Sequence, residues 1–184
     1  MIKVYIIRHG ETIFNKKRIT QGWKDSPLTK KGIESARSHG NFLKSKSIEI
    51  IYSSDLGRCI ETSKIISSII KKKIILSNKI RERNFGIFNG KSDKLIKNKN
   101  FFIYPGIKAP KGESFKQSKN RIIYFLNSIK SQKFKIILLV THEGPMRSII
   151  SYYKNIEPES KKCNTNSSTT LKLNLDTYIL RIIK

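Results

Sequence analysis

The chain begins with the stretch Ile2-Lys3-Val4-Tyr5-Ile6-Ile7-Arg8-His9-Gly10-Glu11-Thr12, in which a short apolar run leads directly into polar and charged residues. Such a run is typical of a strand that is covered on both faces of a sheet. The same design returns at Ile136–Val140, which leads into Thr141-His142-Glu143-Gly144. Ligands of open α/β sheets bind at the carboxyl ends of the strands. Two histidines delivered there, with Arg8 beside one of them, indicate phosphate chemistry.

Strands and helices alternate along most of the chain, which predicts an α/β fold with a mainly parallel sheet flanked by helices. The expected strands cover residues 2–7, 48–53, 73–76 and 136–140, and the expected helices cover residues 28–44, 55–70, 114–131 and 145–153, with Thr29 and Asp55 as the first two N-caps. Glycine and proline leave residues 83–113 irregular, with at most one short helix, and residues 168–183 predict a hairpin around Asp176. Because no repeat or linker interrupts this pattern, we expect one domain over residues 1–184.

The composition is strongly basic, with a formal net charge of +25 from 38 Lys and Arg against 13 Asp and Glu. One interpretation is a nucleic-acid-binding protein, since phosphate backbones attract such charge. The other is compositional drift, because the abundant Lys, Ile and Asn residues all have A/T-rich codons. The lysines are scattered along the chain rather than clustered, which favours drift and predicts no nucleic-acid partner.

The two cysteines, Cys59 and Cys163, form neither a disulfide framework nor a zinc-binding spacing. Cys59 is expected to pack inside a helix as a small apolar residue. The opening apolar run is too short for a signal peptide, and no run approaches the roughly 20 residues of a membrane span. We therefore expect a cytoplasmic protein with no membrane partner.

Several phosphate-binding and catalytic motifs are missing. The stretch from Gly86 to Ser92 resembles a P-loop, but it is one residue short and follows no strand, so we interpret it as a turn. There is no cysteine-phosphatase loop, no nucleophile elbow and no paired-histidine zinc motif. The third histidine, His39, lies among polar residues of a predicted helix and is expected on the surface.

His9 and His142 are either buried structural histidines or parts of a catalytic site. The repeated strand-end placement favours catalysis, because a neutral imidazole is a good nucleophile toward phosphorus. The charge on a transferred phosphoryl group needs several fixed positive donors. Arg8 and Arg58 fit this need, since a guanidinium binds phosphate through two N–H groups.

A leaving alkoxide also needs a proton, which a carboxylic acid has to supply. Glu82, in Arg81-Glu82-Arg83, is one candidate, although its local sequence alone describes a surface ion-pair residue. Glu113, in Gly112-Glu113-Ser114, is a rival, although it also has the character of an ordinary helix opener. The residues themselves leave both acids open.

Five ordered blocks of residues together resemble the histidine phosphatase superfamily, or phosphoglycerate-mutase-like family, over nearly the whole chain. They are Arg8–Thr12 with Asn15, Gln21–Thr29 with Gly32 and Ala36, Tyr52–Leu56 with Arg58 and Thr62, Arg81-Glu82 with Phe85, Gly86 and Gly90, and Gly112–Ser114 with Val140–His142. The resemblance implies a three-layer sandwich and a phosphohistidine mechanism with no metal and no cofactor. It also implies that His9 is the nucleophile, that Glu82 is the acid and then the base, and that the phosphoryl group is held by Arg8, Asn15, Gln21, Gly22, Arg58 and His142.

The family contains hydrolases and mutases, and the departures of this chain favour a hydrolase. The resemblance implies a tyrosine in mutases where Phe85 stands, and a pair of arginines in a longer insertion after the acid. Here no arginine lies between Arg83 and Arg121. The chain is more similar to the compact phosphatases of broad specificity. Glu143 is a further departure, since glycine is usual after the second histidine.

We therefore predict a metal-independent phosphatase that acts on small phosphorylated metabolites, with specificity set by residues 84–113. The first alternative is a 2,3-bisphosphoglycerate-dependent phosphoglycerate mutase. The second is a basic nucleic-acid-binding protein with a vestigial site. A homodimer is left open.

Overall fold

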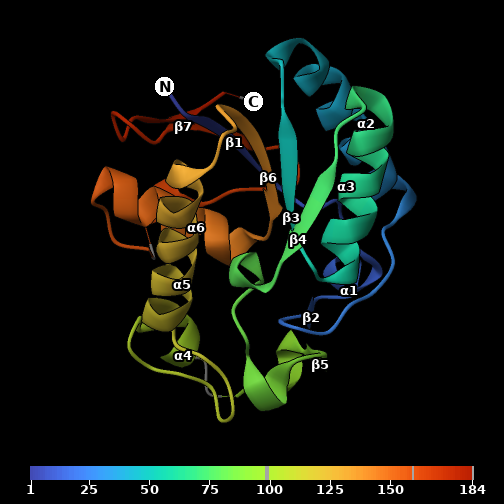
Figure 1. Cartoon of the computed structure of the whole chain (residues 1–184). Coiled ribbons are helices and arrows are strands. Elements are labelled where there is room, and N and C mark those ends of the chain that lie inside the picture. Colours follow the sequence, from blue (N-terminus) through green and yellow to red (C-terminus); the bar gives the residue numbers. More distant parts are fainter. Residues whose placement is uncertain (98–99, 159, 184) are drawn as a thin grey trace.

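A computed structural model of the protein describes residues 1–97, 100–158 and 160–183. A six-stranded sheet runs through its centre (Figure 1). In spatial order its strands are β4 (Ile74–Ser77), β3 (Ile50–Ser54), β6 (Ile136–Thr141), β1 (Lys3–Arg8), β7 (Thr170–Asn174) and β8 (Leu180–Ile182). The first four are parallel, whereas β7 is antiparallel to β1 and β8 is antiparallel to β7. The predicted mainly parallel sheet and the predicted C-terminal hairpin are confirmed.

Two pairs of helices cover the two faces of this sheet and complete the expected three layers (Figure 1). They are α2 (Lys30–Leu43) with α3 (Gly57–Ile70), and α5 (Phe115–Ser128) with α6 (Glu143–Lys154). Successive strand residues point to opposite faces. Val4 therefore joins the core under α5 and α6, and Tyr5 joins the core under α2 and α3. Cys59 is buried in the second core, as predicted.

A smaller layer lies beyond the carboxyl ends of the parallel strands, at the lower end of Figure 1. It consists of α1 (Ile13–Lys16), β2 (Ile19–Thr20), β5 (Lys91–Ser92) and α4 (Asn100–Ile103). Strands β2 and β5 pair as a short antiparallel ribbon, which the sequence did not predict. Short 3-10 turns occupy Lys44–Lys46, Asn78–Ile80, Gly86–Phe88, Asp93–Leu95, Ile129–Ser131 and Lys161–Cys163. The P-loop-like stretch is thus a turn followed by an edge strand.

His39 is buried, so its predicted surface position is wrong. Only 2% of it is exposed. Its Nε2 lies 2.8 Å from the Ser167 carbonyl oxygen and its Nδ1 lies 3.2 Å from the Thr170 hydroxyl. The polar face of α2 packs against the segment that leads into β7. A buried imidazole is acceptable there because both ring nitrogens have a partner.

The sequence predicted Asp55 as the N-cap of α3, and this prediction is wrong. The N-cap is Leu56, and it makes no side-chain capping bond. Asp55 instead accepts two hydrogen bonds from Arg81, both of 2.6 Å, and the pKa of its carboxyl is lowered mainly by these bonds. A charged bidentate pair outweighs a single capping bond. Thr29, by contrast, caps α2 by accepting from the Gly32 N–H.

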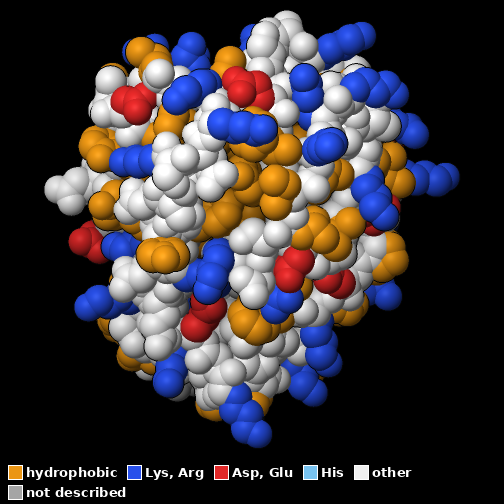
Figure 2. All heavy atoms as spheres, in the orientation of Figure 1, with side chains coloured by type: hydrophobic (Ala, Val, Ile, Leu, Met, Phe, Trp, Pro, Cys, Tyr) orange, Lys and Arg blue, Asp and Glu red, His pale blue; other side chains and the backbone are white. Residues whose placement is uncertain are grey.

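The basic side chains on the face shown in Figure 2 lie scattered among other residues and do not form one continuous patch. Across the described part of the chain, none of the helices combines the length and apolar character that crossing a membrane requires.

Candidate active site

The two strand-end histidines meet because β1 and β6 are adjacent and in register. Arg8 lies opposite Thr141, and the His9 N–H donates to the Thr141 carbonyl over 2.9 Å. This pairing brings the imidazole rings of His9 and His142 to 5.1 Å between centroids, at an angle of 63°. Both side chains are buried. The sequence prediction that the two histidines share one sheet edge is confirmed.

Arg58 lies at the second position of α3 and joins the two histidines to the loop after β2. Its Nε–H lies 3.2 Å from His9 Nε2 and 3.2 Å from His142 Nδ1. Its terminal nitrogens donate to the Lys24 carbonyl, the Gly22 carbonyl and the Asp25 carboxylate. The guanidinium is therefore fixed in place although only 2% of the residue is exposed.

Hydrogen bonds fix the tautomer of His9. Its Nδ1 lies 2.8 Å from the Gly10 carbonyl oxygen, which can only accept, so Nδ1 carries the proton and Nε2 keeps its lone pair. The tautomer of His142 follows in the same way, because its Nδ1 accepts from the Arg58 Nε–H, which can only donate. Its Nε2 therefore carries the proton and lies 2.9 Å from the Ser54 hydroxyl, which can accept.

Both imidazoles are held neutral. Burial lowers the pKa of His9 well below its ordinary value, and the charges of Arg58 and Arg8 lower that pKa further. The pKa of His142 is lowered for the same reason, first by burial and then by Arg58. A neutral His9 with an unprotonated Nε2 is the form that attacks an electrophile, and here this Nε2 accepts from the Arg58 Nε–H.

Glu82 reaches the same site from the segment after β4. Its carboxylate accepts from the Gly144 N–H over 3.2 Å and from the Arg83 N–H over 2.8 Å. Gly144 is the second residue of α6, and a Cβ at this position would collide with Glu82 Oε1. The glycine two residues after His142 is therefore the reason that the carboxylate can approach the helix.

Two side chains hold the backbone around Glu82. Trp23 donates its indole N–H to the Glu82 carbonyl over 2.8 Å. Arg121 donates to the backbone carbonyls of Lys79 and Arg81. Its Nη2 also donates to the backbone carbonyl of Glu82 over 3.3 Å. Glu113 binds Arg121 through both oxygens, at 2.6 and 2.9 Å. The structure thus places Glu113, the rival acid, in a supporting ion pair rather than in the pocket lining.

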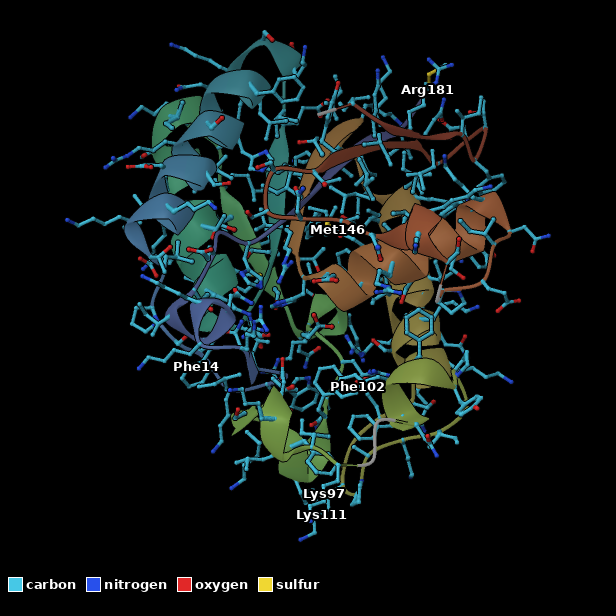
Figure 3. The ribbon with its side chains drawn as sticks, turned by 180° about the vertical axis from the view of Figure 1, so that it is seen from behind. Phe14, Lys97, Phe102, Lys111, Met146 and Arg181 are labelled. Atoms are coloured by element: carbon cyan, nitrogen blue, oxygen red, sulfur yellow. The ribbon has the colours of Figure 1, made fainter. Side chains whose placement is uncertain are left out.

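A pocket of about 400 Å³ opens over these groups. Most of the residues predicted for the site line it, namely Arg8, His9, Asn15, Gln21, Gly22, Arg58 and Glu82. His142 is not part of the lining and lies behind, in contact with Arg58. The lining also includes aromatic residues, among them Phe102 of α4, which Figure 3 shows below α6 and its buried Met146.

The loop residues of the site have defined conformations. Asn15 belongs to the capping box of α1, in which its amide oxygen accepts from the Thr12 N–H. The Gln21 amide oxygen accepts from the Thr12 hydroxyl. Gly22 has a φ of +52°, and a Cβ there would meet the Asn89 side chain, so only glycine fits while its carbonyl binds Arg58.

Glu143 lies at the pocket with its carboxylate 2.8 Å from Arg8 Nη1. Arg147 follows one helical turn later, 4.0 Å from the same carboxylate, and also lines the pocket. Within the described residues, no group of three or more His, Cys, Asp or Glu side chains is arranged to hold a metal ion.

The family model of the histidine phosphatase superfamily (branch 1) matches residues 4–180. The chain belongs to the histidine phosphatase superfamily. A relative from Hydrogenobacter thermophilus, provisionally named phosphoserine phosphatase 2, is 30% identical over 87% of this chain and 82% of its own length. A relative from Proteus mirabilis, provisionally named phosphoglycerate mutase GpmB, is 33% identical over 82% of this chain and 74% of its own. The solved structure of Bacillus stearothermophilus YhfR superposes with a TM-score of 0.88 at 26% identity, covering 99% of this chain and 95% of that one.

Sequence reasoning for this histidine phosphatase missed several residues that shape the site. Trp23 and Asp25 stood in a quoted motif, but no role followed from their side chains. Arg121 and Arg147 had no signal, because each lies on a helix whose contacts with the site are set only by packing. Residues 84–113 contain no arginine, as the sequence shows. The sequence did not indicate that Arg147 reaches the pocket from α6.

Proposed function

We propose that this histidine phosphatase hydrolyses small phosphomonoesters through a phosphohistidine and without a metal. The observation that supports this most is the state of His9, which is neutral and whose unprotonated Nε2 lies beside the positive charges of Arg8 and Arg58 and accepts from the Arg58 Nε–H. Glu82 lines the same pocket and can exchange protons with a leaving oxygen. The name of the Hydrogenobacter relative supports a hydrolase as well.

In the first step His9 Nε2 attacks phosphorus, and the bond between phosphorus and the ester oxygen breaks. The protonated carboxyl of Glu82 gives its proton to that oxygen, so the alcohol leaves neutral. In the second step the Glu82 carboxylate takes a proton from water, whose oxygen attacks phosphorus while the P–N bond breaks. Inorganic phosphate leaves, and both His9 and the acid form of Glu82 are restored.

The surrounding donors would hold the phosphoryl oxygens during both steps. Arg8 and Arg58 supply positive charge, and the Asn15 amide and the loop at Gln21 and Gly22 line the same space. His142 lies behind Arg58 and accepts from its Nε–H through Nδ1, which helps to hold the guanidinium in place. Preorganised donors of this kind stabilise the charge that develops on the phosphoryl group.

Trapping the intermediate tests this proposal. Rapid quench after mixing with a substrate that carries labelled phosphate should give a protein-bound label that is labile to acid and stable to base. His9→Ala should abolish both the label and turnover, whereas His39→Gln, at a histidine away from the pocket, should keep both. Full activity of a folded His9→Ala protein would overturn the mechanism.

A mutase remains the second candidate because the Proteus relative carries that name. Binding to nucleic acid receives less support, since the basic side chains on the face in Figure 2 form no continuous footprint.

A further inference from the structure

The wall of the pocket next to the phosphate-binding arginines carries a carboxylate. Glu143 lines the pocket, and its Oε2 contacts Arg8 Nη1 at 2.8 Å, while 37% of its side chain is exposed. The chain is strongly basic, yet four arginines and three carboxylates line this pocket. An acid at this place therefore needs a reason beyond average composition.

A bound phosphate would lie beside this carboxylate. Arg8 has further N–H groups besides the one that Glu143 occupies, so it can bind phosphate while keeping Glu143. Two anionic groups would then share one guanidinium, which is unfavourable because like charges repel. A cation on the substrate, placed between its own phosphate and Glu143, would remove this conflict.

The neighbouring arginine offers a place for an anion one helical turn away. Arg147 is held by the Pro158 carbonyl, which accepts from its Nε and its Nη2. Its Nη1 faces Glu143 at 4.0 Å, and 28% of its side chain is exposed toward solvent and the pocket. Arg83 also lines the pocket, but its guanidinium is already bound, since it donates to the Phe101 carbonyl and lies over the Phe85 ring.

We propose that Glu143 and Arg147 form a receptor for a zwitterion, so that the substrate is an O-phosphoamino acid. This inference rests on the proposed phosphatase function and names its substrate class. Glu143 binds the ammonium group next to the phosphate, and Arg147 binds the carboxylate beyond it. In O-phosphoserine both groups branch from the carbon that follows the phosphorylated one, which matches two side chains that lie side by side on α6.

Three substrates test the Glu143 contact with the ammonium group and the Arg147 contact with the carboxylate one at a time. O-phospho-L-serine carries both charges, 3-phosphoglycerate has a hydroxyl in place of the ammonium group, and phosphoethanolamine lacks the carboxylate. The wild-type protein should prefer phosphoserine in kcat/KM by roughly 10- to 100-fold over either, the size expected for one hydrogen bond between charged groups. A preference near unity would overturn the proposal.

Two variants assign the preference to its residues. Glu143→Gln should remove most of the preference over 3-phosphoglycerate, and Arg147→Met should remove most of the preference over phosphoethanolamine. The comparison uses ratios within one variant, so any effect of Glu143 on Arg8 cancels, because both substrates transfer the same phosphoryl group. Asp93→Asn removes a carboxylate from the lining at the β2–β5 ribbon and should leave both ratios unchanged.

The outcomes separate this inference from the function on which it rests. If the wild-type protein forms the His9 adduct and hydrolyses p-nitrophenyl phosphate, but Glu143→Gln keeps the full preference, the zwitterion receptor is wrong and the phosphatase stands. If the wild-type protein hydrolyses none of these esters and forms no adduct, the proposed function itself fails.

Discussion

The indole N–H of Trp23 donates to the backbone carbonyl of Glu82 over 2.8 Å, across 59 positions of sequence. The Arg81 guanidinium lies over the Trp23 ring, 4.8 Å from its centre. Gly22, the residue before Trp23, accepts a hydrogen bond from Arg58 through its backbone carbonyl. One loop therefore fixes both the arginine beside the histidines and the segment that carries the acid.

Trp23→Phe should weaken acid catalysis without disturbing the phosphate site. Phenylalanine keeps a ring beneath Arg81 but lacks the N–H, and one such hydrogen bond contributes about 1 kcal/mol. We expect kcat/KM for an alkyl phosphate to fall by roughly 3- to 10-fold, with a smaller fall for p-nitrophenyl phosphate, whose leaving group hardly needs a proton. Equal losses on both esters would show that Trp23 does not act through Glu82.

Glu82→Gln should slow the hydrolysis of alkyl phosphates by roughly 10²–10⁴-fold, the usual contribution of a general acid. The loss should again be smaller for p-nitrophenyl phosphate. Glu113→Gln is the matched control, since it removes the other candidate acid but only weakens the ion pair with Arg121. If Glu113→Gln shows the larger loss and the stronger dependence on the leaving group, the acid has been misassigned.

Local sequence predicted the edge of the sheet that carries the candidate site, because its determinants are local. The apolar runs of β1 and β6 end directly at His9 and His142, and parallel pairing then brings these ends together. The predicted helix cap at Thr29 similarly depends on Gly32, three positions away. Periodicity and chain order were sufficient for these features.

The errors concern residues whose partners are distant in sequence. His39 was expected on the surface, yet it is buried against Ser167 and Thr170, which lie 128 and 131 positions away. Asp55 has the character of an N-cap until Arg81, 26 positions later, is placed beside it. No local pattern indicates such pairings, because they exist only after the helices have packed on the sheet.

The stability of the protein should decrease below about pH 6.5 because His9 and His142 are buried in neutral form. Their pKa values are lowered in the folded state, so the unfolded chain binds more protons as the pH falls through the ordinary histidine pKa. Each group then removes up to about 1.4 kcal/mol per pH unit from the free energy of unfolding. Urea unfolding between about pH 7.5 and about pH 5 measures this slope. His142→Asn should make the slope shallower, and an unchanged slope would contradict the assignment.

Activity should survive treatment with excess EDTA. In the proposed mechanism Arg8 and Arg58 neutralise the phosphoryl charge, which is the role that Mg²⁺ takes in other phosphoryl-transfer enzymes. The measurement is the rate of phosphate release before and after chelation and dialysis. A loss of activity that Mg²⁺ or Zn²⁺ restores would refute a metal-independent mechanism.

Hydrolysis should exceed mutase activity on phosphoglycerate. A mutase has to keep water from its phosphohistidine and to hold a second anionic group in either orientation, which favours several arginines over the site. Residues 84–113 contain no arginine. Two further arginines line the pocket: Arg83 is fixed on the Phe101 carbonyl, and Arg147, whose side chain is 28% exposed, faces Glu143.

The deciding assay supplies 3-phosphoglycerate with a catalytic amount of 2,3-bisphosphoglycerate and follows both 2-phosphoglycerate and free phosphate. We expect phosphate to be released faster than 2-phosphoglycerate accumulates, because residues 84–113 supply no arginine to cover the intermediate. His9→Ala is the control and should abolish both products. Faster accumulation of 2-phosphoglycerate would replace the hydrolase with the mutase.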